Sequence, residues 1–202
     1  MTEAERDREL RIQTEGTIEI LQNSAHYNRY EATPYDVLDE LFLAYPLEPG
    51  DHLVDFGCGK GRVPFYCCDR FGCSITGIDL NGRLLQEAYA NLASFRRGGS
   101  KKRRGVITFE EVKAENYPIQ PEQTVFYCFN PFSTEIFKSV VHGILESLEE
   151  APRQADILLY YPTADYLEFL DEQTPFVRKE EIAIPVLVEN DPDERVVIYR
   201  HE

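Results

Sequence analysis

The feature that most constrains this chain is a glycine-rich turn between an apolar run and a helix-like stretch. Residues 52–56 have the pattern of a short buried strand, glycines follow at positions 57, 59 and 61, and helical spacing runs over 62–71. Glycines at such a junction let the backbone turn tightly and approach a ligand, with helix N–H groups facing that ligand. The turn is therefore a candidate ligand loop, although a purely structural left-handed turn would also need glycine.

Strands and helices alternate after this turn. In chain order we expect strand 74–79, helix 81–95 capped by Asn81, strand 106–112, strand 124–129, helix 133–150 and strand 156–161. Two further apolar runs, 182–188 and 195–200, flank a turn at 190–193 and predict an antiparallel hairpin. Strands joined by helices predict an α/β protein of the Rossmann-like, doubly wound type, with a mostly parallel sheet covered on both faces.

The first 45 residues precede this alternation. Charge-rich residues 1–16 predict a frayed or surface helix, and apolar residues recur with helical spacing in 17–30. Thr33 and Pro34 then predict the start of a helix that runs through Leu43, with Thr33 as its N-cap. We therefore expect a helical extension or lid at 1–45, followed by one domain at 46–202.

An acidic residue ends the second expected strand. The carboxylate of Asp79 could accept hydrogen bonds from both hydroxyls of a ribose, whereas its structural alternative is a helix cap. The dinucleotide fingerprint G-x-G-x-x-G requires a third glycine at position 62, where this chain has Arg62. Asp55, two residues before the first glycine, would repel a pyrophosphate but would supply countercharge to an ammonium group.

The segment 54–61, with Gly77-Ile78-Asp79-Leu80, resembles motif I and the following segment of class I S-adenosylmethionine-dependent methyltransferases. The resemblance extends over about 51–202 and implies a seven-stranded sheet whose last strand inserts antiparallel. It also implies that the glycine loop packs against the methionine moiety and that Asp79 holds the ribose. The family often places an acidic and a small residue after the third strand to contact adenine. Here Lys113 stands where the acid is expected, so Ala114 and Glu115 are the candidates for that contact.

The fourth strand is followed by Asn130, Pro131 and Phe132, which are candidate catalytic residues. The amide oxygen of Asn130 and the carbonyl of Pro131 could accept hydrogen bonds from an NH2 group, and Phe132 could stack on a planar substrate. The element resembles the Asn-Pro-Pro-aromatic motif of amino-methyltransferases, with one proline missing. A strand-ending turn capped by Asn130 is the structural alternative.

An aromatic segment lies ahead of the first strand. The resemblance implies that it folds over the cofactor, so that Tyr27, Tyr30, Thr33 and Tyr35 line a lid or substrate pocket, while Arg29 could bind a carboxylate or phosphate. The structural alternative is ordinary helix packing with tyrosine hydroxyls at the surface.

Charge and cysteine content restrict the partners. With 21 Lys+Arg against 36 Asp+Glu, the net charge of −15 disfavours nucleic acid, although residues 96–104 form a basic segment. Four clustered cysteines with Cys128 apart, and four scattered histidines, have no metal-ligand spacing, which predicts buried thiols in a cytoplasmic protein without a metal. No apolar run is long enough to span a membrane.

These patterns favour a methyltransferase that uses S-adenosylmethionine and acts on an unidentified acceptor, such as a nitrogen of a small molecule or of a protein side chain. The two alternatives are an NAD-dependent oxidoreductase and a cofactor-binding module without catalysis. The sequence selects neither the acceptor nor an oligomeric state.

Overall fold

The computed structural model describes residues 1–16, 28–97, 105–184, 191 and 193–202. The helix expected within 17–30 falls mostly outside this part, and the described residues 28–30 are not helical. The basic residues 98–104 and Tyr27 also lie outside it.

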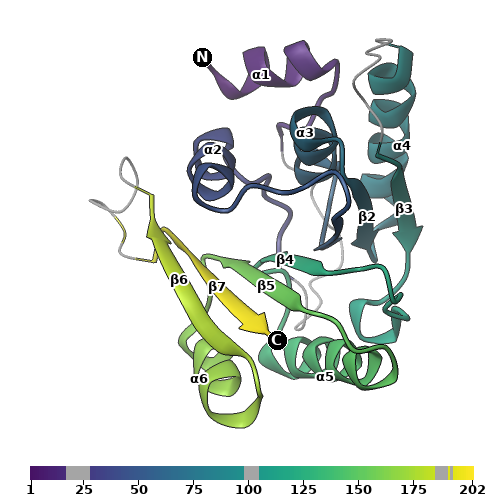
Figure 1. The fold of residues 1–202 in the computed structure, drawn as a ribbon. Helices are drawn as coiled ribbons and strands as arrows, with labels where there is room; N and C mark the ends of the chain where they lie inside the picture. Colours follow the sequence, from purple (N-terminus) through teal and green to yellow (C-terminus); the bar gives the residue numbers. More distant parts are fainter. Residues whose placement is uncertain (17–27, 98–104, 185–190, 192) are drawn as a thin grey trace.

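One sheet of seven strands forms the centre of the molecule (Figure 1), in the order β3-β2-β1-β4-β5-β7-β6. All pairings are parallel except those of β7, which is antiparallel to both β5 and β6. The strands are β1 His52–Phe56, β2 Ser74–Asp79, β3 Ile107–Glu111, β4 Val125–Phe129, β5 Ala155–Tyr160, β6 Val177–Ala183 and β7 Arg195–His201. The expected fold class, including the antiparallel hairpin, is confirmed.

Helices cover both faces of the sheet (Figure 1). They are α1 Glu3–Leu10, α2 Tyr35–Ala44, α3 Arg62–Phe71, α4 Gly82–Arg97, the short 3-10 helix η1 Ala114–Asn116, α5 Thr134–Glu150 and α6 Ala164–Gln173. Two hydrophobic cores result, because successive strand residues point to opposite faces. Leu53 packs with α2, α3 and α4, whereas Val54 and Phe56 pack with η1, α5 and α6.

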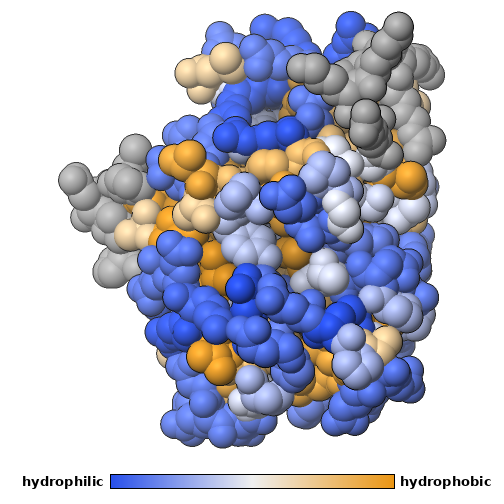
Figure 2. Space-filling model, in the orientation of Figure 1, coloured by the Kyte–Doolittle hydropathy of each residue, from blue (hydrophilic) through white to orange (hydrophobic). Residues whose placement is uncertain are grey.

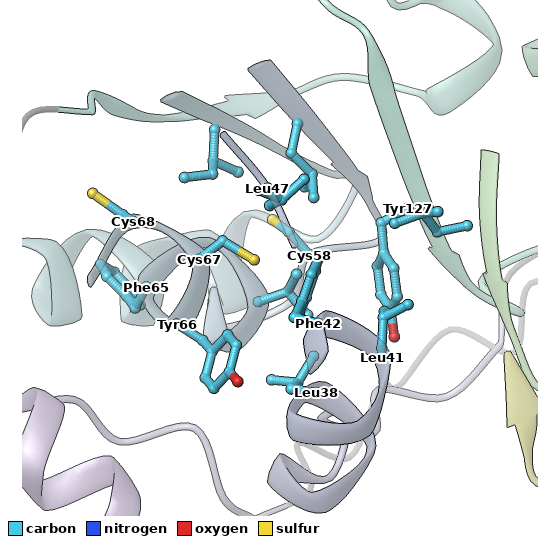
Figure 3. Packing of buried hydrophobic residues seen from close by; sticks show 14 of the residues in the cluster. Leu38, Leu41, Phe42, Leu47, Cys58, Phe65, Tyr66, Cys67, Cys68 and Tyr127 are labelled. Atoms are coloured by element: carbon cyan, nitrogen blue, oxygen red, sulfur yellow. The ribbon is translucent and has the colours of Figure 1, made fainter. Parts of the chain in front are cut away.

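Figure 3 shows part of the first core, in which Tyr66 of α3 lies toward Leu38 and Phe42 of α2, while Phe65 packs on Phe95 and Phe109. All five cysteines are buried free thiols, as expected. Burial raises the pKa of the Cys67 thiol well above its usual range and that of Cys73 to about 12. These thiols are therefore protonated packing groups rather than nucleophiles.

The start of α2 differs from the prediction. The helix begins at Tyr35 after Pro34, and the backbone N–H of Tyr35 donates to the carboxylate of Glu3 at 3.2 Å rather than to Thr33. Thr33 is instead buried, and its hydroxyl lies 2.9 Å from the hydroxyl of Tyr127 on β4. The N-cap assignment for Thr33 is therefore wrong, because this tertiary hydrogen bond takes the side chain away from the helix.

The N-terminal helix is also better ordered than expected. A capping box formed by Thr2 and Glu5 starts α1, and Asp7 in its middle is only 3% exposed. Because a buried carboxylate needs partners, α1 is joined to the body of the protein by specific polar contacts rather than frayed at the surface.

The sixth strand was predicted at 182–188, of which 185–188 lie outside the described residues, and it is found at Val177–Ala183. It lies at the edge of the sheet, pairs only with β7 and exposes most of its side chains. Charged residues such as Arg178 and Glu181 are typical of an edge strand but hide it from an apolar pattern. Helix α6, which precedes the strand, was not predicted.

In Figure 2 the visible face is mostly hydrophilic, with hydrophobic residues gathered in the middle, in the region where Figure 1 places α2 and β6. Within the described residues, none of the helices combines the length and the apolar character that a bilayer crossing requires.

Candidate functional site

The glycine loop joins β1 to α3 and has a left-handed backbone at all three glycines, with φ of 81°, 54° and 88° at Gly57, Gly59 and Gly61. The backbone N–H groups of Gly57 and Cys58 both donate to the carbonyl of Ile78 on β2, at 2.8 and 3.0 Å. A side chain at position 57 would also collide with Pro131, whose Cβ lies 2.7 Å from the position of an added Cβ. Sterics therefore require glycine here, and the loop is held tightly against the sheet.

A cavity of about 630 Å³ lies above the carboxyl ends of β1 to β4. We call the part lined by 78–84, Gln86, 111–112 and Ala114 its β2–β3 end, and the part lined by 28–33, Asp55, 57–58, 62–63, Tyr127, Phe129 and 131–132 its β1–β4 end. Ligands of open α/β sheets bind at this edge.

Ten of the predicted site residues line the cavity: Arg29, Tyr30, Thr33, Asp55, Gly57, Asp79, Leu80, Ala114, Pro131 and Phe132. Gly59, Gly61, Tyr35, Glu115 and Asn130 are not among its lining residues. Tyr27 falls outside the described part of the chain.

Asp79 sits where the two ends of the cavity meet. Its carboxylate accepts the backbone N–H of Gly59 at 2.9 Å and that of Asn81 at 2.7 Å. Burial raises the pKa of Asp79, and the backbone hydrogen bonds from Asn81, Gly59 and Leu80 oppose this rise. A carboxylate has about four lone-pair sites, so Asp79 can still accept a hydrogen bond from a hydroxyl donor of a ligand.

Asp55 is 3% exposed and also lines the cavity. Burial and then the negative charge of Asp79 raise its pKa well above the usual range. No donor from the described residues offsets these two effects. Two neighbouring carboxyl groups that resist ionisation favour a cationic or hydrogen-donating ligand, because such a ligand would stabilise their charged forms.

At the β2–β3 end, Ala114 is the first residue of η1 and is buried beside the cavity, while Glu115 is half-exposed outside the lining. Glu111, the last residue of β3, does line the cavity. Sequence reasoning missed this carboxylate because it searched only the residues after the strand. The alternation of buried and exposed residues along 107–111 could have shown that Glu111 ends the strand.

The Asn-Pro-Phe element follows β4, and Asn130 has a left-handed backbone with φ of 37°. Asn28 covers the element: its backbone N–H donates to the Pro131 carbonyl at 3.0 Å, and its Nδ2 donates to the Asn130 carbonyl at 2.6 Å. Phe132 is only 3% exposed and belongs to the α5–α6 core, and its carbonyl accepts the Tyr166 hydroxyl. The half-buried aromatic ring at this end of the cavity is Phe129.

The aromatic segment closes the β1–β4 end. The Tyr30 ring lies against the glycine loop, since an added Cβ at Gly59 would be 2.1 Å from Tyr30 Cε2. Arg29 is exposed at the rim, whereas Tyr35 is fully buried away from the cavity and donates its hydroxyl to Asp7 at 2.7 Å. Sequence reasoning did not assign roles to Tyr127 and Arg62, which also line this end.

Within the residues that the structure describes, no group of three or more His, Cys, Asp or Glu side chains is arranged to hold a metal ion.

This geometry can be set beside known proteins. No family model matches the chain. Among curated proteins, the geranyl diphosphate 2-C-methyltransferase of Saccharopolyspora erythraea is 38% identical over 56 residues, which are 28% of this chain and 19% of that protein. The enzyme of the same name from Streptomyces lasalocidi is 47% identical over 36 residues, which are 18% of this chain and 12% of that protein. These matches span less than a fifth of either relative.

Solved structures align over most of the chain. An RNA methyltransferase from Salinibacter ruber, in complex with S-adenosyl-L-homocysteine, has a TM-score of 0.54 at 18% identity and covers 84% of this chain and 92% of its own. A SAM-dependent methyltransferase from Geobacter sulfurreducens, in complex with the same compound, has a TM-score of 0.55 at 17% identity and covers 83% and 90%. A Pyrococcus horikoshii protein proposed to be an RNA methyltransferase has a TM-score of 0.59 at 14% identity and covers 98% and 97%.

At these identities the likeness concerns the fold. The chain has the Rossmann-like fold of the class I S-adenosylmethionine-dependent methyltransferases, which the resemblance of its glycine loop and Asp79 implied.

Proposed function

We propose that this protein is an S-adenosylmethionine-dependent methyltransferase. The observation that carries the proposal is the pair Asp55 and Asp79, a buried and a half-buried carboxyl group on either side of a glycine loop in one cavity. A ligand with ribose hydroxyls at one end and an ammonium group at the other satisfies both carboxylates. NAD would instead bring a pyrophosphate beside Asp55, which disfavours the oxidoreductase alternative.

The cavity divides naturally along such a ligand. We assign the ribose to Asp79 and the adenine to the β2–β3 end, near Leu80, Glu111 and Ala114. The amino-acid part then lies in the β1–β4 end, beside Gly57 and Asp55. When bound, the cofactor supplies a methyl group on a sulfonium, which a positioned nucleophile displaces without a strong base.

The acceptor site belongs to the β1–β4 end. Phe129 and Pro131 line it, and Asn130 follows the strand directly. We propose that the Asn130 amide and the Pro131 carbonyl orient the acceptor. Asn28 already donates to the Pro131 carbonyl, so an incoming NH2 group shares or displaces that bond. Because Phe132 is 3% exposed, Phe129 is better placed than Phe132 to stack on a planar acceptor.

The class of acceptor follows from charge. Several proteins of similar fold act on RNA by their names, and the curated relatives act on geranyl diphosphate by theirs. The net charge of −15 opposes binding of a polyanion. We therefore propose that the acceptor is a small molecule or a protein side chain, with nucleic acid as the less favoured class.

We also propose that residues 1–45 act as a lid over the site.

Methyl transfer can be tested without knowing the acceptor. The purified protein would be incubated with separate panels of small amines, peptides and RNA, with the same concentration of S-adenosylmethionine in every reaction. Formation of S-adenosylhomocysteine would be followed. Turnover on one panel that is lost in Asn130→Ala supports the proposal. Tight cofactor binding without turnover on any panel would favour a binding module without catalysis.

A further inference from the structure

The two cationic residues on either side of Gly61, Lys60 and Arg62, contact the N-terminal segment, residues 1–45. Lys60 is 6% exposed and its Nζ donates to the Glu15 carbonyl at 3.0 Å. Arg62, the first residue of α3, is 4% exposed. A loop whose glycines turn the backbone therefore also presents two nearly buried cations to residues far away in the sequence.

Arg62 is the more extensively bonded of the two cations. Its Nε donates to Thr14 Oγ1 at 2.6 Å, and its Nη1 donates to the Thr33 carbonyl at 3.1 Å. The guanidinium also forms ion pairs with Glu3 and, at 3.7 Å, with Asp7 of α1. The Arg62 side chain thus joins residues 3–14, which include α1, and Thr33 to the start of α3.

These contacts continue to the glycine loop. The Thr14 carbonyl accepts the Tyr30 hydroxyl at 2.7 Å, and the Tyr30 ring lies on Gly59. The Thr33 hydroxyl is paired with that of Tyr127 in the cavity. Arg62 therefore fixes two residues, Tyr30 and Thr33, that line the β1–β4 end.

The anchoring residues themselves lie elsewhere. Glu3, Asp7 and Thr14 are not among the residues that line the cavity, whereas Arg62, Tyr30 and Thr33 are. If position 62 served packing alone, an apolar side chain would suffice there. A buried ion pair such as that of Arg62 adds little to stability on its own, so its role is better sought in positioning. Lysine could not replace Arg62, since it lacks the planar fork that serves Thr14 and Thr33 together.

We propose that Arg62 is a positioning residue for the cofactor: it fastens residues 3–14 and 30–33 over the amino-acid part of the ligand, so that residues outside the cavity determine affinity for that part. The inference rests on the proposed function. It assigns Arg62 an effect on one half of the cofactor and not on the other. Within the described residues, the side chain of Asp79 bonds Gly59 and Asn81, and Glu111 and Ala114 lie at the same β2–β3 end, away from Arg62 and Thr14.

Two probes separate the halves. S-adenosylhomocysteine carries both the adenosine and the amino-acid part, whereas 5′-methylthioadenosine lacks the latter. Dissociation constants for the first would be measured by calorimetry, and those for the second by displacement of the first, in the wild type and in Arg62→Met. We expect at least a tenfold loss of affinity for S-adenosylhomocysteine and less than a twofold loss for methylthioadenosine.

The control is Arg70→Met on the same helix, since Arg70 is exposed and contacts Asp39, Tyr66 and the Phe71 ring rather than the cavity. It should change neither affinity.

If Arg62→Met does not fold, Tyr30→Phe tests the same link, because it removes only the hydroxyl that reaches Thr14. We expect about a threefold loss of affinity for S-adenosylhomocysteine and none for methylthioadenosine. Equal weakening of both probes, or no weakening, in a folded variant would overturn the inference. Failure of the wild type to bind S-adenosylhomocysteine would instead refute the proposed function.

Discussion

The two ends of the cavity are built in different ways. The β2–β3 end comes from elements of one β-α-β unit, with Asp79, Glu111 and Ala114 at successive strand ends. The β1–β4 end is closed by residues from the N-terminal segment. Asn28 of this segment donates to the Pro131 carbonyl, and Glu3 forms an ion pair with Arg62. The first end is dictated by local sequence, and the second depends on contacts between segments far apart. Binding of the adenosine part should therefore survive changes that weaken binding of the amino-acid part.

The largest effect is expected where the ends meet. Asp79→Ala removes charge-assisted hydrogen bonds worth about 1.5–3 kcal/mol each, so the loss of two bonds to ribose hydroxyls corresponds to at least about a hundredfold weaker binding of S-adenosylhomocysteine. Methylthioadenosine should lose as much, since it carries the same ribose. Glu149→Ala at the exposed end of α5 is the control. An unchanged affinity in Asp79→Ala would remove the ribose assignment.

Glycine substitutions compare the loop with an ordinary helix. Gly59→Ala forces an added Cβ against the Tyr30 ring at a left-handed backbone position, and should destabilise the fold by about 1–3 kcal/mol. Gly143→Ala in α5 meets nothing within 4 Å and should stabilise it by about 0.5–1 kcal/mol. Thermal unfolding measures both. Similar tolerance at the two positions would mean that Tyr30 does not rest on the loop in solution.

The pH dependence tests the β1–β4 end. The pKa values of Asp55 and Asp79 are raised in the free protein. Each carboxyl group is therefore still partly protonated at pH values above about 4, where an ordinary Asp is ionised. An ammonium ligand binds the ionised form, so affinity should rise as the pH increases above about 4, with proton release on binding. Asp55→Asn should flatten this rise. The methylthioadenosine profile, which lacks the ammonium, is the comparison, and identical slopes for both ligands would contradict the role of Asp55.

The smallest effect is expected at the rim. Asn28→Ala removes the Nδ2 bond to the Asn130 carbonyl but leaves the backbone N–H bond to Pro131. Since Asn28 is exposed, affinity for S-adenosylhomocysteine should change by less than about threefold. A much larger loss, measured by the same calorimetry, would show that the rim contributes to cofactor binding as strongly as the buried contacts of Arg62.

What the sequence revealed follows the same division. The strand His52–Phe56, the glycine loop and Asp79 were predicted because each has a local signature: an apolar run, a steric need for glycine and an acidic strand end. Arg62 was noted only as a missing glycine, because its partners Glu3 and Thr33 come from segments with no pattern that points to position 62. The bounds of the edge strand β6 were not predicted for a related reason, since its exposed charged residues leave no apolar periodicity.

The most direct test of the cofactor assignment is a calorimetric titration of the wild-type protein with S-adenosylhomocysteine and, separately, with NAD. A cavity with Asp55 and Asp79 at its centre should bind S-adenosylhomocysteine with a dissociation constant on the order of micromolar and NAD not measurably. Binding of NAD, or of neither compound, would contradict the assignment and leave only the fold in common with the methyltransferases.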